Sequence, residues 1–393
     1  MEVRSKIKIW LLTACLFLLS VTAALLLAEV LLRSHPPDLI AYRNVRVPDP
    51  ILHHKLNPSS SYIHRDAEYT VEVRTNSLGM RDREYVPSPG PEVRILVLGD
   101  SFTEGYGVPV ESCFVKVLER KLNEQGDAPT RVKVFNAGVA GYSPLLEYLY
   151  LKRKGLSLLP HLVVLCYDMN DVQEDAIYSE NATFDSTGIP LTVSPALVPS
   201  GRMGFFPSGR VKTFLNLYSY VYITLRTFVG TVVDLPGFDP NNVRGNHFLH
   251  TLDSTGHRWD EDFERSERYV ELAFNLCRAR GIPFLLVVYP RGNQVSPLEW
   301  SEGRKHWNLE STQYNSVIFR SLRSFADRKR IPYLDMTGAF RRASAGDLYF
   351  SLDDHWTVKG HKVAADTLYQ FISSQMSPLS SGAPLGVLEN FNR

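Results

Sequence analysis

Cysteine is scarce in this sequence: 4 of the 393 residues, with no CxxC pair. That scarcity excludes a cysteine-rich zinc module and a disulfide-dense scaffold. An excess of one charge sign is also missing, since 43 Lys and Arg face 42 Asp and Glu. Proteins that bind nucleic acid normally carry a clear basic excess, so we expect no nucleic-acid partner. The apolar content of 44% is ordinary for a globular chain.

Several catalytic and cofactor motifs are absent as well. No Gly-x-Ser-x-Gly elbow occurs, which argues against the α/β-hydrolase form of a serine enzyme. No Walker loop or Rossmann fingerprint is present, because Gly105-Tyr-Gly107 lacks the third glycine. The histidines show no HExxH or other zinc spacing. We therefore expect neither a cofactor nor a metal.

The N-terminus contains an uncharged apolar run of 20 residues, 9–28, which follows three basic residues. As a helix it would be about 30 Å long, the thickness of a bilayer's hydrocarbon core. We predict a cytoplasmic segment 1–8, a transmembrane signal anchor 9–28, and an extracytoplasmic remainder, periplasmic in a Gram-negative cell. A cleaved signal peptide is an alternative, although Glu29–Arg33 offers no small-residue cleavage site. A lipoprotein signal ending at Cys15 is another.

The remainder is predicted to contain a membrane-proximal segment 29–90, a catalytic domain 91–375 and a flexible tail 376–393. Tyr69–Thr75 predicts an exposed strand in the membrane-proximal segment. An insertion at about 174–260 carries the sequon Asn181-Ala-Thr183 and an aromatic-rich stretch, 211–233, that Arg226 interrupts. This insertion is expected either to pack on the core as a lid or to lie in the membrane interface.

Apolar strands alternate with amphipathic helices from residue 94 onward, which predicts a three-layer α/β/α domain with a parallel sheet. The predicted strands are Arg94–Leu98, Val132–Asn136, Leu162–Tyr167, Phe284–Tyr289 and Ile331–Asp335. The predicted helices are Glu111–Gln125, Pro144–Lys154, Asp262–Arg280, Ser311–Lys329 and Val358–Ser374.

Three of these strands are followed by residues that could take part in catalysis. They lie at the edge of the sheet where parallel sheets bind ligands. Gly99-Asp100-Ser101 follows the first strand, and Ser101 could act as a nucleophile while its N–H faces a developing oxyanion. Gly141 follows the second strand, and its N–H could serve the same oxyanion. Asn170 follows the third and could add a side-chain amide. A purely structural role is the alternative for each residue. Ser101 could be the N-cap of a helix, and Gly141 and Asn170 could serve only to form turns.

A carboxylate–histidine pair precedes the last helix, where Asp353 and Asp354 stand directly before His355. A late His with a nearby carboxylate is typical of the base in a Ser-His-Asp triad. We predict that Asp353 orients His355, because residues two apart in an extended segment point to the same side. Asp354 should then face solvent or a backbone amide, and His361 should face solvent or pack locally.

The motifs around Ser101, Gly141, Asn170 and His355 form four sequence blocks. In their order along the chain, the sequence resembles the SGNH (GDSL-like) hydrolase superfamily over roughly residues 93–372. By this resemblance Ser101 is the nucleophile and His355 is the base. The amides of Ser101 and Gly141, together with Asn170, form the oxyanion hole.

The last block departs from the usual Asp-x-x-His spacing, because Leu352 stands three residues before His355. Asp353-Asp-His-Trp356 is instead similar to the Asp-x-His-Trp form of membrane-associated or periplasmic relatives. These include proteins of alginate and other exopolysaccharide O-acetylation.

The resemblance implies a serine esterase that acts through an acyl-enzyme on acetyl or other O-acyl esters of an extracytoplasmic carbohydrate. One alternative is an O-acetyltransferase of exopolysaccharide or cell-envelope glycan, and a second is a non-catalytic glycan-binding or assembly subunit. Expected partners are an acylated small molecule or glycan, the membrane, and envelope polysaccharide-assembly proteins. Tyr142, Tyr178 and Trp356 could stack on sugar rings or pack in the core.

Overall fold

The computed structural model describes residues 2–35, 41–124, 131–195, 214–215, 218–225, 260–306 and 317–375. The chain forms two compact units, residues 1–43 with 196–237 and residues 44–195 with 238–393. The predicted tail 376–393, Arg226 and most of the stretch 211–233 lie outside the described residues.

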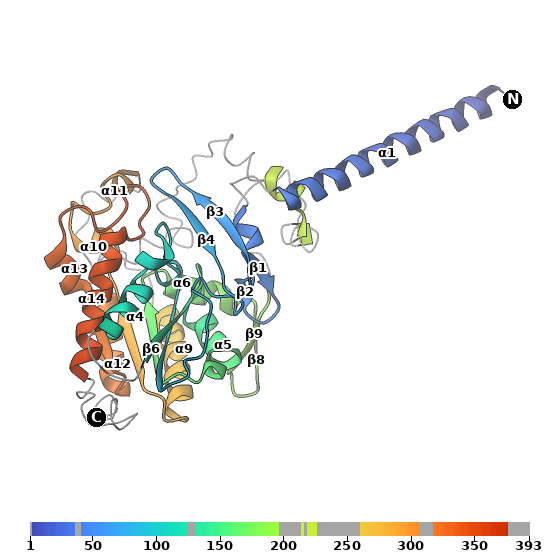
Figure 1. The fold of residues 1–393 in the computed structure, drawn as a ribbon. Coiled ribbons are helices and arrows are strands. Elements are labelled where there is room, and N and C mark those ends of the chain that lie inside the picture. Colours follow the sequence, from blue (N-terminus) through green and yellow to red (C-terminus); the bar gives the residue numbers. More distant parts are fainter. Residues whose placement is uncertain are drawn as a thin grey trace. The chain divides into compact units, whose positions relative to one another are not determined.

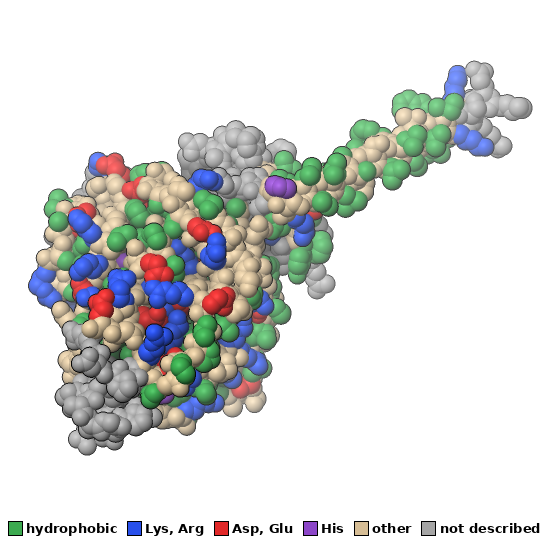
Figure 2. All heavy atoms as spheres, in the orientation of Figure 1, with side chains coloured by type: hydrophobic (Ala, Val, Ile, Leu, Met, Phe, Trp, Pro, Cys, Tyr) green, Lys and Arg blue, Asp and Glu red, His purple; other side chains and the backbone are tan. Residues whose placement is uncertain are grey.

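Helix α1 (Glu2–Ser34) is the main element of the first unit. Within it, Lys6–Ser34 is long and apolar enough to cross a membrane, with a mean hydropathy of 2.5. Hydrophobic side chains cover most of its length (Figure 2), and the span is not buried in the protein. These properties fit a membrane anchor or a signal sequence, and the predicted span 9–28 lies inside this helix.

A parallel sheet of five strands forms the centre of the second unit (Figure 1), in the order β11-β10-β7-β5-β6. Every residue of β7 and β10 is buried. Continuous apolar strands of this kind are expected where helices cover both faces of a sheet. The strands are β5 (Glu92–Gly99), β6 (Arg131–Gly138), β7 (Leu162–Tyr167), β10 (Phe284–Val288) and β11 (Tyr333–Asp335).

Helices cover both faces of this sheet, which confirms the predicted α/β fold. One face packs on α4 (Phe114–Glu124) and α14 (Val358–Gln375), which contact each other. The other packs on α5 (Pro144–Arg153) and α9 (Asp260–Arg278), and α6 (Asp171–Ser179) lies against α9. The remaining helices are α3 (Ser101–Glu104), α10 (Gly292–Val295), α11 (Ser301–His306), α12 (Val317–Lys329) and α13 (Thr337–Ala343).

The helix predicted from Glu111 differs at its start, because a 3-10 turn occupies Val110–Ser112 and α4 begins at Phe114. Residues 311–316 of another predicted helix lie outside the described residues. Helix α6 continues to Ser179, so the first residues of the expected insertion pack with the core helices.

Within the described residues, three antiparallel hairpins accompany the sheet: β1 (Arg46–Asp49) with β2 (His53–Leu56), β3 (Ser61–Arg65) with β4 (Thr70–Arg74), and β8 (Ala182–Phe184) with β9 (Pro190–Val193). The first two belong to the predicted membrane-proximal segment, and both fold with the second unit. The prediction that β4 is an exposed strand is only half right. Val71 and Val73 are buried while their neighbours are exposed, so one side of β4 faces the protein.

Candidate active site

Ser101, Gly141 and Asn170, which follow the carboxyl ends of β5, β6 and β7, line one pocket together with His355, whereas Asp353 lies behind His355 and does not line it. The pocket has a volume of about 310 Å³. Such an edge is where ligands of parallel sheets bind. The lining residues are Ser101, Gly141, Asn170, Gln173, Glu174, Ile177, Arg291, Asp354 and His355.

Ser101 is placed by the tight turn that leads from β5 into α3. A Cβ atom on Gly99 would lie 2.1 Å from Thr103 Oγ1, so this turn requires glycine. Asp100, rather than Ser101, caps the short helix, because its Oδ1 accepts the N–H of Phe102 at 2.9 Å. The explanation of Ser101 as a helix N-cap is therefore wrong, and its hydroxyl remains available to the pocket.

Ser101, His355 and Asp353 form a continuous hydrogen-bonded chain. Ser101 Oγ lies 2.7 Å from His355 Nε2, and His355 Nδ1 bonds Asp353 Oδ1. The backbone N–H of His355 also donates to Asp353 Oδ1, at 3.0 Å. Because a carboxylate can only accept, Nδ1 carries the proton and Nε2 is left to accept from the Ser101 hydroxyl. This is the arrangement that a general base for a serine nucleophile needs.

The electrostatics keep Asp353 ionised. Burial alone would raise its pKa, but the charge of His355 and the hydrogen bonds from His355 and Tyr69 outweigh burial. The pKa of Asp353 is consequently held well below its usual range. A charged Asp353 in this position would stabilise an imidazolium if His355 took a proton.

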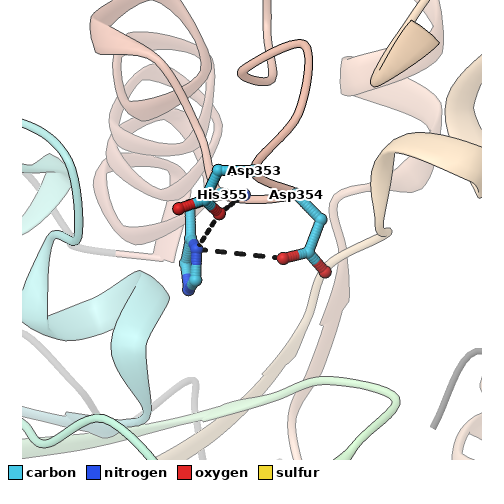
Figure 3. Close-up of side chains that lie close together, drawn as sticks. All are labelled: Asp353, Asp354 and His355. Carbon is cyan, nitrogen blue, oxygen red and sulfur yellow. Dashed lines mark hydrogen bonds and ion pairs between the residues drawn. The ribbon is translucent and has the colours of Figure 1, made fainter. Parts of the chain in front are cut away.

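Asp354 has a different partner from the one predicted. Figure 3 shows both carboxylates near the same ring nitrogen of His355, which they approach from different directions, and Asp354 Oδ1 lies 3.8 Å from His355 Nδ1. Its second oxygen forms an ion pair with Arg291. The expectation that Asp354 faces solvent or a backbone amide is therefore wrong, because a buried guanidinium occupies that side.

Arg291 was not identified from the sequence. It follows β10, bonds Asp168 at 2.7 Å, and lies over the ring of Phe102 with 5.4 Å between its guanidinium carbon and the ring centroid. Its position just beyond the end of an apolar strand, like that of Ser101 or Asn170, is a signal that could have identified it.

The candidate oxyanion donors come from three elements. The N–H groups of Ser101 and Gly141 have no acceptor among the described residues. Gly141 adopts a φ of 79°, a left-handed conformation that favours glycine. Asn170 stands at the N-cap position of α6, and its buried Oδ1 has no partner in the described part of the chain. Its amide hydrogen-bonds Glu174, which also lines the pocket.

Buried residues hold the Gly141 turn in place. Glu104 accepts the N–H of Ala140 at 2.7 Å, and Tyr178 donates to the carbonyl oxygen of Gly141 at 2.6 Å. On the far side of the turn, His54 Nε2 lies 2.9 Å from the carbonyl oxygen of Ala140. Burial and the charge of Arg46 lower the pKa of His54 to about 3, so this imidazole is neutral.

Comparison with known families decides the assignment. A model of the GDSL-like lipase/acylhydrolase family matches residues 97–363. The chain belongs to this family. It is therefore an ester-hydrolysing enzyme of the SGNH type, and the matched region contains every candidate catalytic residue named above. A search of the curated proteins found no significant match.

Solved structures align with this acylhydrolase at low similarity. A putative lipolytic protein of the G-D-S-L family from Desulfitobacterium hafniense is 12% identical, with a TM-score of 0.37, over 71% of this chain and 98% of its own. An acetyl xylan esterase is 15% identical, with a TM-score of 0.39, over 71% and 99%. An acetylxylan esterase from Geobacillus stearothermophilus is 12% identical, with a TM-score of 0.37, over 72% and 94%. These likenesses are too distant to bear on the substrate.

A buried group of carboxyls lies beside the candidate catalytic residues of this acylhydrolase. Burial, followed by the charge of Asp168, raises the pKa of Asp100 to about 7. Burial and the charges of Asp100 and Asp175 raise the pKa of Glu147 well above its usual range. Both carboxyl oxygens of Glu147 lack a hydrogen-bond partner among the described residues. An uncharged, protonated Glu147 is therefore the favoured form at neutral pH.

One group of side chains among the described residues has ligand atoms close enough together to hold a metal ion. Ligand atoms of Asp353, Asp354 and His355 lie within 4.8 Å of one another. However, Nδ1 and Nε2 of His355 already bond Asp353 and Ser101. A cation bound there would have to take one of those nitrogens from the catalytic chain, so this group does not fit a metal site.

The aromatic residues considered for sugar stacking pack in the core instead. Tyr142, Tyr178 and Trp356 are all buried. His361 is buried as well, and its Nδ1 accepts the N–H of Phe114 at 3.2 Å. Of the two alternatives for His361, local packing is therefore the one that the structure supports. Cys113, Cys166 and Cys277 are buried free thiols.

Proposed function

We propose that this acylhydrolase removes acetyl or similarly short acyl groups from an extracytoplasmic carbohydrate through a covalent ester on Ser101. The observation that carries the catalytic part is the hydrogen-bonded chain from Ser101 through His355 to Asp353, which opens on a pocket with three candidate oxyanion donors.

The mechanism follows from these positions. His355 Nε2 takes the proton of the Ser101 hydroxyl as Oγ attacks the acyl carbon, and the carbonyl π electrons move onto oxygen. The N–H groups of Ser101 and Gly141 and the amide of Asn170 stabilise that oxyanion. When the oxyanion collapses, the bond to the alcohol oxygen breaks and His355 returns the proton to the leaving alcohol. Water, activated by the same imidazole, then adds to the acyl-enzyme and releases the carboxylic acid.

The lining of the pocket supports a short acyl group and a polar alcohol. Among the described lining residues, Ile177 is the one with an aliphatic side chain, and the others apart from Gly141 carry charged or polar side chains. A long acyl chain would gain about 0.8 kcal/mol for each CH₂ group buried in an apolar channel. The described residues of the lining form no such channel, whereas their amides, carboxyls and guanidinium suit the hydroxyls of a sugar.

The proposed location follows from helix α1. A basic segment before an apolar span favours a cytoplasmic N-terminus, which supports the proposal that the catalytic unit lies outside the cytoplasm, in the periplasm of a Gram-negative cell. Polymers of the cell envelope or their acetylated precursors are the carbohydrates that such an enzyme would meet.

The substrate proposal can be tested with the full-length protein in detergent. We expect the kcat/KM for p-nitrophenyl acetate to exceed that for the octanoate by at least tenfold. Acetate should also be released from an acetylated polysaccharide, and addition of an unacetylated glycan should not divert the acetyl group to sugar. A preference for octanoate would contradict the short-acyl proposal, and transfer to the added glycan would identify an O-acetyltransferase instead.

A further inference from the structure

The turn between β3 and β4 contacts the loop of residues 351–355, here called the catalytic loop, from outside the region that the family model matches. Glu68 and Tyr69 lie at this turn, and the match begins at residue 97. Their neighbours Asp66, Ala67 and Thr70 are exposed, whereas Glu68 and Tyr69 are half-buried. Both of these side chains contact the segment that carries Asp353.

Glu68 binds the backbone of the catalytic loop. Its carboxylate accepts the N–H of Ser351 at 2.6 Å, and those of Leu352 and Asp353 at 2.8 Å each. Three successive amides therefore converge on one carboxylate. Hydrogen bonds to a charged acceptor are stronger than neutral ones, so this contact restrains the backbone directly at Asp353.

Tyr69 binds the side chain of the same residue. Its hydroxyl donates to Asp353 Oδ2 at 2.8 Å, while Oδ1 of that carboxylate bonds His355. Each oxygen of Asp353 thus has its own partner, and rotation of the carboxylate would break both bonds. The Tyr69 ring is held against Phe350, with 4.9 Å between ring centroids.

We infer that Glu68 and Tyr69 are positioning residues for catalysis, which fix the backbone and the carboxylate of Asp353 so that Oδ1 faces His355. The inference rests on the proposed role of Asp353, His355 and Ser101 in forming the acyl-enzyme. It makes the β3–β4 hairpin, in the predicted membrane-proximal segment, a part of the active site. Neither residue touches the reacting atoms, so their effect must pass through Asp353.

The full-length protein tests this with Tyr69→Phe, which removes the hydroxyl alone, and Glu68→Ala, which removes the acceptor of three amides. One matched control is Tyr62→Phe, because the hydroxyl of Tyr62 is buried in the same hairpin without a partner among the described residues. The other is Glu72→Ala on β4. Glu68→Gln keeps an acceptor oxygen and should recover part of the loss. Fluorophosphonate labelling gives two readouts, the rate constant per site and the final labelled fraction.

We expect Tyr69→Phe to lower kcat and the labelling rate constant about tenfold, and Glu68→Ala to lower both about a hundredfold. The KM should change less than twofold. The final labelled fraction should equal that of the wild type, because every site remains folded and reacts with the probe, only more slowly. Both controls should remain within twofold of the wild type.

Two results would overturn this inference alone. One is an unchanged kcat in Tyr69→Phe and Glu68→Ala while Ser101→Ala is inactive, which would leave the proposed function intact. The other is a loss confined to the labelled fraction at an unchanged rate constant, which would show a role in folding alone. Turnover retained by Ser101→Ala would overturn the proposed function and this inference together.

Discussion

Asp353 and Asp354 are adjacent in the chain but bind different groups: Asp353 bonds the imidazole of His355, and Asp354 forms an ion pair with Arg291. Only one of them is therefore arranged to orient the base, although Asp354 also lies within 3.8 Å of His355 Nδ1.

Asparagine substitutions should separate the two carboxylates. Asp353→Asn keeps the size of the side chain but favours the wrong tautomer of His355, a change that costs about 10⁴-fold in one well-studied triad. Asp354→Asn should cost less than about tenfold in kcat/KM, because Arg291 retains its bond to Asp168. The measurement is kcat/KM for both variants, with folding checked by circular dichroism. A severe defect in Asp354→Asn with a mild one in Asp353→Asn would reverse the assignment.

Arg291 should be important for stability as well as for the pocket. Arg291→Gln would leave the buried carboxylate of Asp168 without its cation, and breaking a buried ion pair in this way typically costs about 3–5 kcal/mol. Chemical denaturation of the full-length protein measures this loss. The exposed pair of Arg74 and Glu72 provides the control, since Arg74→Gln should leave the denaturation midpoint unchanged. Equal effects of the two substitutions would argue against a buried network around Arg291.

Glu147 predicts a pH dependence of stability with a definite sign. Burial raises the pKa of this carboxyl in the folded protein, so the unfolded chain loses the proton first as the pH rises. Folding is then penalised progressively above about pH 4.5, by up to about 1.4 kcal/mol per pH unit until the folded pKa is reached. Glu147→Gln removes the titration, so its Tm relative to the wild type should be higher at pH 8 than at pH 5. A difference that is the same at both pH values, or larger at pH 5, would contradict a protonated Glu147.

The anchor proposal predicts that the mature protein keeps residues 1–28 and stays in the membrane after an alkaline wash. A reporter fused to the C-terminus should be active outside the cytoplasm and inactive within it. A mature N-terminus after residue 28 would identify a cleaved signal sequence. Substituting two or three leucines of the span with arginine should release the protein from the membrane fraction.

Local sequence patterns predict the central fold well. Strand β7 has the predicted bounds, Leu162–Tyr167, because a strand buried on both faces is a continuous apolar run. Ser101, Gly141 and Asn170 could be found because each follows such a strand, and a parallel sheet brings those ends together. The order of the blocks then indicated the family.

The partners that surround the catalytic loop could not be predicted in the same way. Glu68 reaches Ser351 across 283 residues, and Arg291 reaches Asp354 across 63. No local periodicity encodes such pairs, because they depend on how two loops meet in the folded protein. Strands β1 and β2 have only four residues each, too few for a clear alternation. Figure 2 likewise shows charges of both signs interspersed over the domain face drawn there, so charge pattern gave no further guide.

The central claim is that Ser101 forms a covalent acyl-enzyme. The most direct measurement is intact-mass spectrometry of the full-length protein quenched during turnover of an acetyl ester. We predict an adduct of one acetyl group on Ser101, fluorophosphonate labelling of the same residue, and loss of both in Ser101→Ala. That variant should retain its fold while its kcat falls on the order of 10⁶-fold, as when the nucleophile of a triad is removed. A folded Ser101→Ala protein that still hydrolyses the ester, or an adduct on another residue, would contradict the account.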